Sequence, residues 1–223
     1  MSQPTLGLRE RKKQLTRSTI ADTALQLVLE KGLERVTLEE LARIAFVSPR
    51  TVSNYFSGKE EAIAAAGRNL SDSIVDDLAE RPADEAPLES VFQVTVKFIR
   101  SLTPTELEAQ RQKRRLGERY PAIKAYLTAR YELAEELTRP AMAARSGTDL
   151  DGIYPWLLAA SAVAAVKVTV LRWATTDTDR EELLRMINAS FAHLQNGLQP
   201  PPQTGEEKPS DGHWMMSWPS QAE

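Results

Sequence analysis

The sequence has 223 residues, with no cysteine and only two histidines, His193 and His213. The lack of cysteine excludes disulfides and thiolate zinc sites, because both need its sulfur atom. The two histidines are far apart in sequence, so the sequence does not indicate a histidine-based metal or catalytic cluster. We therefore predict a protein with no catalytic residue, no metal site and no cofactor.

The common motifs of catalysis are missing as well. The sequence contains no Gly-rich phosphate loop and no HExxH motif. Its paired carboxylates, such as Asp76–Asp77 and Glu135–Glu136, occupy adjacent helical positions, from which the side chains diverge. These absences predict that the protein is not an enzyme.

Signal and membrane segments are not indicated either. The charged N-terminus is not followed by the apolar segment that a signal peptide requires. The longest apolar run, residues 153–174, is interrupted by Lys167 and is rich in alanine, and we interpret it as a buried helix rather than a membrane span. We expect a cytoplasmic protein with no membrane partner.

The net charge of -3 is unevenly distributed. Residues 1–60 contain ten Lys or Arg and seven Asp or Glu, whereas the rest of the chain is acidic. The N-terminal basic cluster comprises Arg9, Arg11, Lys12, Lys13 and Arg17, opposed only by Glu10. A local basic cluster on an acidic protein indicates an anionic partner, although many such runs are only solvated tails.

Apolar residues recur with helical spacing along most of the chain. No alternating Val, Ile and Thr run indicates a strand. We predict an all-α fold of about nine helices, with an N-terminal three-helix helix-turn-helix domain and a larger helical domain after it. The expected divisions are an N-terminal arm and helix-turn-helix in 1–58, one connecting helix in 59–80, the second domain in 81–197 and a disordered tail in 198–223. The tail's WMMSW segment could alternatively dock on the protein.

Residues 37–56 predict two short helices joined by a tight turn. Thr37 and Glu40 match a capping box at the start of the first helix. Ser48 is a good N-cap for the second, and Pro49 follows at the first helical position. This layout is typical of a helix-turn-helix, although capped helix pairs also occur in proteins that bind no DNA.

A helical wheel divides the second of these helices into an inner and an outer face. Val52 and Phe56 share the face suited to the core, while Arg50 and Asn54 point the opposite way. Arginine can bind guanine, and asparagine adenine, through two hydrogen bonds. Hydroxyl groups, helix N-termini and the basic cluster suit phosphates, and the cluster could instead reach into the minor groove. The predicted DNA-binding residues are Arg9, Arg11, Lys12, Lys13, Arg17, Thr37, Ser48, Pro49, Arg50, Thr51, Ser53, Asn54, Tyr55 and Lys59.

The series RSTIADTALQLVLEKGLERVTLEELARIAFVSPRTVSNYFSGKEEAI, residues 17–63, resembles the DNA-binding domain of TetR family transcriptional regulators. The matching segments are IADTALQL, the Lys-Gly that ends the first helix, VTLEELA, VSPRTVSNYF and Lys59-Glu60. One position departs from the family pattern: Ser53 stands where the family often has an aromatic residue, so we expect a different contact there.

The resemblance implies a homodimer that binds a palindromic operator in double-stranded DNA and is released by a small-molecule effector. The last two helices of such proteins usually pair across the dimer axis. The residues predicted for that interface are Val163, Val170, Leu183, Ile187 and Phe191. A DNA-binding architectural protein without an effector is the alternative function.

Residues from about 114 to 173 loosely resemble the acyl-CoA-type ligand-binding domain of one branch of the family. An acyl thioester needs an apolar tunnel and cations for its phosphates. Other apolar anions, such as a fatty acid, and xenobiotics are competing effectors. The predicted ligand-binding residues are Phe92, Val96, Ile99, Arg114, Arg115, Tyr126, Trp156 and Lys167.

Overall fold

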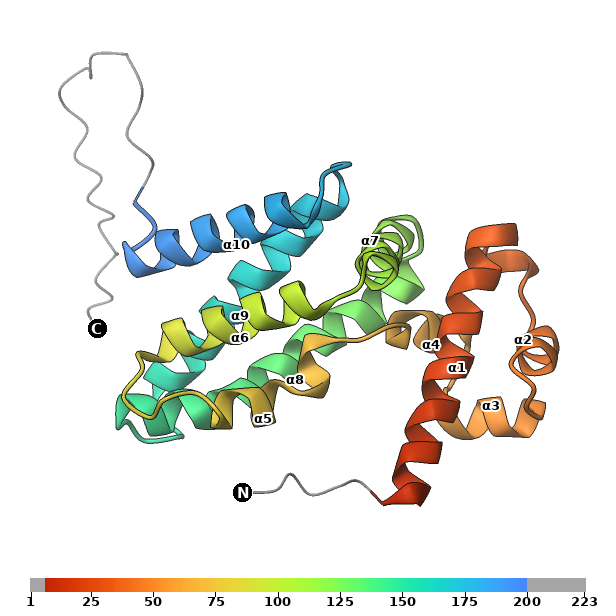
Figure 1. Ribbon diagram of the computed structural model, residues 1–223, viewed down its shortest axis with the longest axis horizontal. Helices are drawn as coiled ribbons and strands as arrows, with labels where there is room; N and C mark the ends of the chain where they lie inside the picture. The colour runs from red at the N-terminus through yellow and green to blue at the C-terminus, as the bar shows by residue number, and fades with distance from the viewer. Residues whose placement is uncertain (1–6, 200–223) are drawn as a thin grey trace, which may run out of the picture.

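The computed structural model describes residues 7–199, and the expectations for the N-terminal residues 1–6 and the tail 200–223 lie outside this range. The described part contains ten α-helices, two short 3-10 helices and no strand. Figure 1 shows how the α-helices are arranged. The all-α prediction is confirmed. The predicted count of about nine helices is one short because the expected connecting helix is broken.

The first helix begins at Leu8, within the segment predicted to contain the N-terminal arm. The bounds of the helices are α1 (Leu8–Lys31), α2 (Leu38–Ile44), α3 (Pro49–Tyr55), α4 (Lys59–Ala65), α5 (Ile74–Ala79), α6 (Pro87–Ser101), α7 (Pro104–Arg119), α8 (Pro121–Ser146), α9 (Ile153–Ala174) and α10 (Arg180–Gln195). The two 3-10 helices are η1 (Leu33–Arg35) and η2 (Leu70–Asp72).

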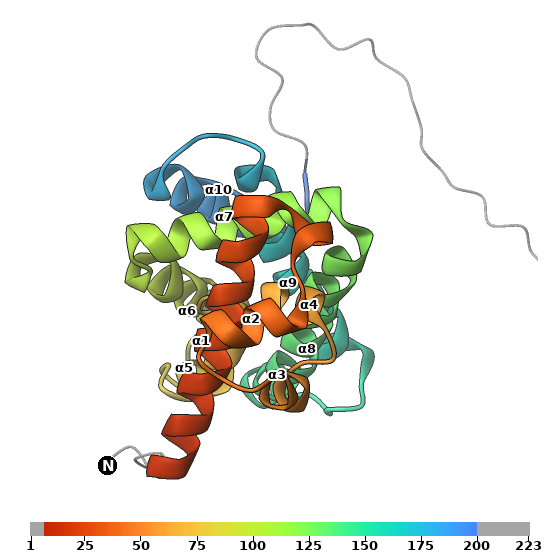
Figure 2. The same cartoon turned by 90° about the vertical axis from the view of Figure 1, so that its right-hand side faces the viewer.

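Helices α1 to α4 form the N-terminal domain at one end of the molecule, which faces the viewer in Figure 2. Their apolar faces make one buried core that includes Ile20, Leu41, Val52 and Phe56. The core continues into α4, where Ile63 is fully buried. The predicted domain end at residue 58 is therefore too early, since α4 packs with the helix-turn-helix.

The connecting segment is not the single helix that was predicted for residues 59–80. Helix α4 ends at Ala65, and Ala66 is extended with φ -60° and ψ 145°. Gly67 follows with φ +66°, a left-handed conformation that glycine adopts without a Cβ clash. Residues 66–69 then lead into η2 and α5. We call residues 66–72 the connector.

Helices α5 to α10 enclose a second core, which contains Val94, Ile99, Trp173, Ile187 and Phe191 among others. Helices α7 and α8 form a hairpin between this core and the first one. Leu116, Ile123 and Leu127 of that hairpin belong to the N-terminal core, so an apolar contact joins the two domains in addition to the connector.

Helix α9 is the one helix in residues 7–199 that is long and apolar enough to cross a membrane by length and composition. In the fold it packs between α8 and α10 (Figure 1). Only 28% of its most apolar window is buried, so one apolar face of α9 stays at the surface. The interpretation of this run as a buried helix is therefore wrong for that face.

Candidate functional site

Helix α3 presents its polar residues to solvent. The Ser48 hydroxyl caps the helix by accepting a hydrogen bond from the Thr51 amide at 3.0 Å, and Pro49 occupies the first turn. Val52 and Phe56 are buried at 0% and 3% exposure. Arg50, Asn54 and Ser53 are exposed, while Thr51 and Tyr55 are half-buried. The inner and outer faces of α3 are thus those of the predicted wheel, and the DNA contacts themselves stay predictions.

The turn before α3 contains a strained residue. Phe46 has φ +55°, a left-handed conformation that is unusual for a bulky side chain. Its side chain is 95% exposed, so no buried contact of its own offsets that strain. This left-handed backbone was not predicted from the sequence.

The N-terminus of α2 has one of the two hydrogen bonds of the predicted capping box. The Thr37 hydroxyl accepts a hydrogen bond from the Glu40 amide at 3.2 Å, as predicted. The Glu40 carboxylate instead forms a 2.5 Å ion pair with Lys31, at the end of α1. The predicted reciprocal capping box is therefore wrong in its second half, because Glu40 ties α2 to α1.

The N-terminal basic cluster is helical rather than an extended arm. Helix α1 starts at Leu8, so Arg9, Arg11, Lys12 and Lys13 occupy its first turns, all exposed. Arg9, Lys12 and Lys13 share a shallow surface depression with Tyr55 of α3. Arg17 lies over the Phe56 ring, 4.9 Å from its centroid. The fold therefore brings the positive start of α1 to the same surface as the end of α3.

Lys59 is hydrogen-bonded within the protein. Its ammonium donates hydrogen bonds to the carbonyls of Leu33 and Val36 at 2.7 and 2.8 Å. These bonds hold the segment before α2 against the start of α4. Sequence spacing alone did not indicate this structural role. An ammonium has three donors, so one remains, and the phosphate contact of Lys59 stays a prediction.

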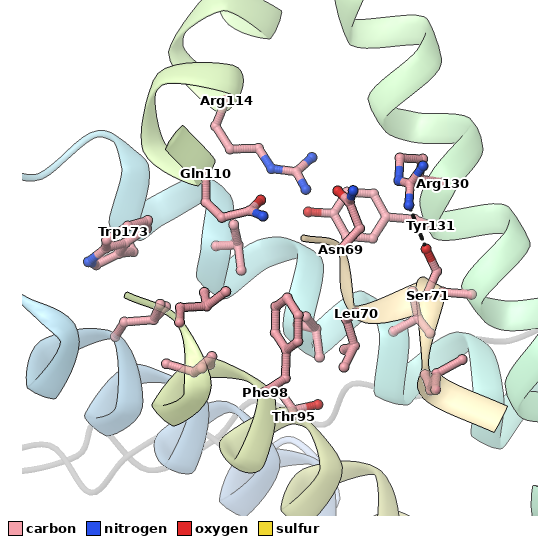
Figure 3. A pocket seen from close by; sticks show the side chains of 18 of the residues that line it. Asn69, Leu70, Ser71, Thr95, Phe98, Gln110, Arg114, Arg130, Tyr131 and Trp173 are labelled. Carbon is pink, nitrogen blue, oxygen red and sulfur yellow. Dashed lines mark hydrogen bonds between the residues drawn. The ribbon is translucent and has the colours of Figure 1, made fainter. Parts of the chain in front are cut away.

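The second domain contains an internal cavity that is lined by the connector and by helices α5 to α10. The volume that the centre of a water-sized sphere can occupy in this cavity is about 90 Å³. Most of its lining is apolar and includes Ile74, Val91, Phe98, Ile99 and Trp173. One end is polar, and there the side chains of Asn69, Gln110, Arg114, Arg130 and Tyr131 come together (Figure 3).

Two of the eight predicted ligand-binding residues, Ile99 and Arg114, line this cavity. The other six do not. Phe92 packs its ring against Phe191 at 5.5 Å, and Val96 is part of the second core. Arg115 donates to the Ala174 carbonyl at the end of α9.

The remaining three residues lie elsewhere on the domain. The Tyr126 hydroxyl hydrogen-bonds Ser57 at 2.9 Å, at the junction with the N-terminal domain. Trp156 is 52% exposed and stacks on Arg139. Lys167 lines a neighbouring cavity, which also contacts Arg114 and Tyr131. Aromatic character alone could not separate core, junction and cavity positions.

Sequence reasoning missed six polar residues of the cavity lining: Asn69, Ser71, Thr95, Gln110, Arg130 and Tyr131. The spacing of Gln110 could have indicated its place in the cavity, because Gln110 and the predicted Arg114 are one helical turn apart and so share a face of α7. The contribution of Asn69 could not be foreseen, because it depends on the break after α4.

Polar side chains of α7 and α8 hold the connector. The ammonium of Lys113, which is 0% exposed, donates to the Ala66 carbonyl and to the Asn69 side-chain oxygen. Gln110 donates to the Arg68 carbonyl. Arg130 donates to Asp72 at 2.6 Å and to Ser71 at 3.0 Å. The connector is therefore both a wall of the cavity and the link to α4.

Burial dominates the electrostatics of this region. Desolvation, with the nearby charges of Arg114 and Arg130, holds the pKa of Lys113 well below its usual range. Desolvation also lowers the pKa of Arg114 and raises that of Tyr131. Arg114 nevertheless remains a cation, since guanidinium stays protonated in proteins.

The five residues predicted for the dimer interface lie inside the chain. Their side chains point into the second core or the cavity. The five residues are Val163, Val170, Leu183, Ile187 and Phe191. The opposite side of α9 is exposed: Leu157 and Val168 are 62% and 63% accessible. We define the α9–α10 outer face as Leu157, Ser161, Ala164, Val168, Ser190, His193, Leu194 and Leu198. Side chains that are buried within one chain are not available to a second copy, so the predicted interface residues are wrong in this respect.

Comparison with known proteins covers both domains. Residues 20–66 match the family model described as bacterial regulatory proteins, tetR family, and residues 85–199 match the MftR C-terminal domain. The HTH-type transcriptional regulator TcmR of Streptomyces glaucescens is 31% identical over 201 residues, which is 87% of each chain. BetI of Rhizobium meliloti is 37% identical over 76 residues, covering 34% of this chain and 37% of that protein.

Among solved structures, Thermus thermophilus FadR in complex with lauroyl-CoA has a TM-score of 0.55 at 20% identity. The match covers 85% of this chain and 100% of that one. At this level of identity the likeness shows a shared fold and leaves ligand specificity undefined.

Proposed function

Because the chain belongs to the TetR family of transcriptional regulators, we propose that it is a repressor released from a palindromic operator by a small apolar effector with an anionic head. Members of this family bind DNA and carry a ligand-binding domain, so the protein is a DNA-binding regulator and not an enzyme. The cytoplasm, where the operator would lie, is the proposed location.

The observation that carries this proposal is the double role of the connector. The same residues that follow α4 also form a wall of the cavity. A ligand that displaces this wall would move α4 and, with it, the N-terminal core that positions α3. A ligand shifts such an equilibrium only as far as it prefers one arrangement over the other.

The proposed dimer buries the α9–α10 outer face. A surface with two highly exposed apolar side chains on one helix is costly in water and is typical of an interaction site. Small residues at Ser161 and Ala164 allow the helices of a second copy to approach closely. The homodimer is also typical of the family, and it would place two α3 helices on successive major grooves, about 34–36 Å apart or a multiple of that distance.

The anionic part of the effector proposal rests on Arg114 at the polar end of an apolar cavity. A fatty-acid-like molecule has both features, and the ligand named for FadR carries an acyl chain as well. An acyl-CoA would in addition need cations for its phosphates. In the arginine-rich part of α7, Arg111 pairs with Asp177 and Arg115 caps α9. The fatty-acid-like effector is therefore favoured over the complete acyl-CoA.

An operator-binding measurement tests the function. Fluorescence anisotropy would compare duplex DNA from the gene's own upstream region with scrambled duplex, at fixed near-physiological salt, with and without decanoic acid. The repressor predicts selective binding that the acid reverses. Equal binding to both duplexes would favour the alternative, an architectural DNA-binding protein, and selection from random DNA would then establish whether any preferred sequence exists.

A further inference from the structure

Arg114 is a largely buried cation that has no acidic partner in residues 7–199. Its Nε atom is buried without a hydrogen-bond partner, and no carboxylate of the described residues forms an ion pair with it. Two neighbouring arginines differ: Arg111 pairs with Asp177 at 2.9 Å and Arg130 with Asp72 at 2.6 Å. An unpaired buried charge is costly, so this position is suited to an anion from outside the chain.

Tyr131 provides a second unused group beside Arg114. Its hydroxyl is buried and lacks a hydrogen-bond partner within the described chain, and its ring centroid lies 4.9 Å from the Arg114 guanidinium. Figure 3 shows the guanidinium and the hydroxyl pointing into the same space at the polar end of the cavity. Both can donate hydrogen bonds, so together they favour a ligand oxygen that accepts them.

The other polar groups nearby are already committed to the connector. Lys113 and Gln110 donate to backbone carbonyls of residues 66–68, and Arg130 is bound to Asp72. Within the internal cavity one guanidinium is therefore left to balance the ligand's charge, since Lys167 lines only the neighbouring cavity. A carboxylate carries one negative charge and matches the guanidinium through two parallel hydrogen bonds, whereas a phosphate carries more charge than this site balances.

We propose that Arg114 and Tyr131 bind the carboxylate head of an apolar carboxylic acid, whose body occupies the cavity. This assignment rests on the proposed effector function and adds the head group and the residues that recognise it. A thioester, an ester or an alcohol of the same body lacks the charge that Arg114 would balance, and each would bind more weakly.

Arg114 and Tyr131 lie where two cavities meet, which defines the place of the head group. Arg114 and Tyr131 line both the internal cavity and the neighbouring one that Lys167 and Lys124 border. The head group would therefore be bound at the junction of the two cavities. With about 90 Å³ available, a medium-length chain fits only if the walls move, since a cavity of roughly 150 Å³ is what benzene occupies in a well-studied case. The connector is one of those walls.

Calorimetric titration of the full-length protein tests the head group. The panel comprises hexanoic, octanoic, decanoic and naphthoic acids, each beside its methyl ester and primary alcohol, together with decanoyl-CoA. We expect at least one acid to bind about tenfold to a hundredfold more tightly than its ester, as a charged hydrogen-bond pair implies. Arg114→Met should abolish that preference, Arg114→Lys should keep part of it, and Tyr131→Phe should reduce it. Arg100→Met is the matched control, because Arg100 is exposed on α6 and also carries one positive charge.

Each outcome is decisive. Equal binding of acids and esters, tighter binding of decanoyl-CoA than of decanoic acid, binding of no member of the panel, or an acid preference that survives Arg114→Met would overturn the head-group assignment. Operator binding without ligand is measured for every variant. Selective operator binding with no acid preference removes only this inference, whereas a wild-type protein that binds no DNA selectively counts against the proposed function. Should Arg114→Met fail to fold, Arg114→Lys and Tyr131→Phe still test the assignment.

Discussion

Arg50 and Asn54 are the residues of α3 on which base recognition is predicted to depend. Both are exposed on the side opposite the buried Val52. We expect Arg50→Ala or Asn54→Ala to lose about 1–3 kcal/mol of discrimination for each two-bond base contact removed. A binding-site logo from random-sequence selection measures this loss. An unchanged logo in both variants would mean that another face of α3 reads the DNA.

The strained Phe46 gives a prediction about stability. Phe46→Gly should stabilise the protein by about 1 kcal/mol. A left-handed conformation costs a residue with a Cβ about 1–2 kcal/mol, and the larger entropy that glycine loses on folding cancels part of the gain. Urea unfolding of the two proteins measures the difference. Phe46→Ala is the control, since alanine keeps a Cβ and thus the strain. If the alanine variant gains as much as the glycine variant, the exposed ring and not the backbone is the cause.

The helices themselves could be predicted well from the sequence, for local reasons. Ser48 and Pro49 define the start of α3, and the spacing of Val52 and Phe56 defines its buried side. The break after α4 could not be predicted in the same way. Residues 60–79 keep a helical pattern of apolar positions, and the interruption depends on Gly67 and on Lys113, a residue distant in sequence that binds the Ala66 carbonyl.

The residues lining the cavity were less predictable than the helices. Position along an apolar helix does not tell which side meets a partner, a core or a cavity. For α9 this led to the choice of Val163 and Val170 for the dimer, although both line the cavity. On the exposed side of α9, Leu157 and Val168 lie among small residues. This pattern identifies the exposed side only when the packing of α8 and α10 against α9 is known.

Lys113 is predicted to couple the cavity to the DNA-binding domain. Lys113→Met leaves the Ala66 carbonyl and the Asn69 side-chain oxygen without their donor, which should cost about 1–3 kcal/mol of stability. Removing a charge beside Arg114 and Arg130 offsets part of this cost. We expect the variant to bind effector but to release operator at a higher effector concentration, because the connector is held less firmly to α7.

Calorimetry and operator anisotropy on the same preparation separate the two effects. Lys97→Met is the matched control: this lysine is exposed on α6, lines neither cavity and pairs with Asp77 at 2.7 Å, a surface contact worth little. If Lys113→Met binds effector and releases operator at the wild-type concentrations, Lys113 only stabilises the fold and does not take part in the coupling.

At the scale of the whole molecule, the two ends have separate surfaces for separate partners. The N-terminal domain carries α3 and the basic start of α1, while α9 and α10 lie in the other domain (Figure 1). The α7–α8 hairpin joins the two cores. A change in the cavity can therefore alter the distance between two α3 helices only if the second domains are held together, which makes the dimer a requirement of the proposed mechanism.

Val168→Glu tests that requirement. Because Val168 is 63% exposed in the single chain, a carboxylate there should leave the fold of each protomer intact, yet would be buried without a partner in a dimer that uses the α9–α10 outer face. We expect light scattering after size exclusion to report a monomer at micromolar concentration, and operator affinity to fall by at least tenfold, since one protomer contacts one half-site. Leu133→Glu on α8, at a residue 44% exposed, should remain dimeric and bind operator normally. A dimeric Val168→Glu protein with full operator affinity would place the dimer interface on a different surface, and the coupling through α9 and α10 would then have to be abandoned.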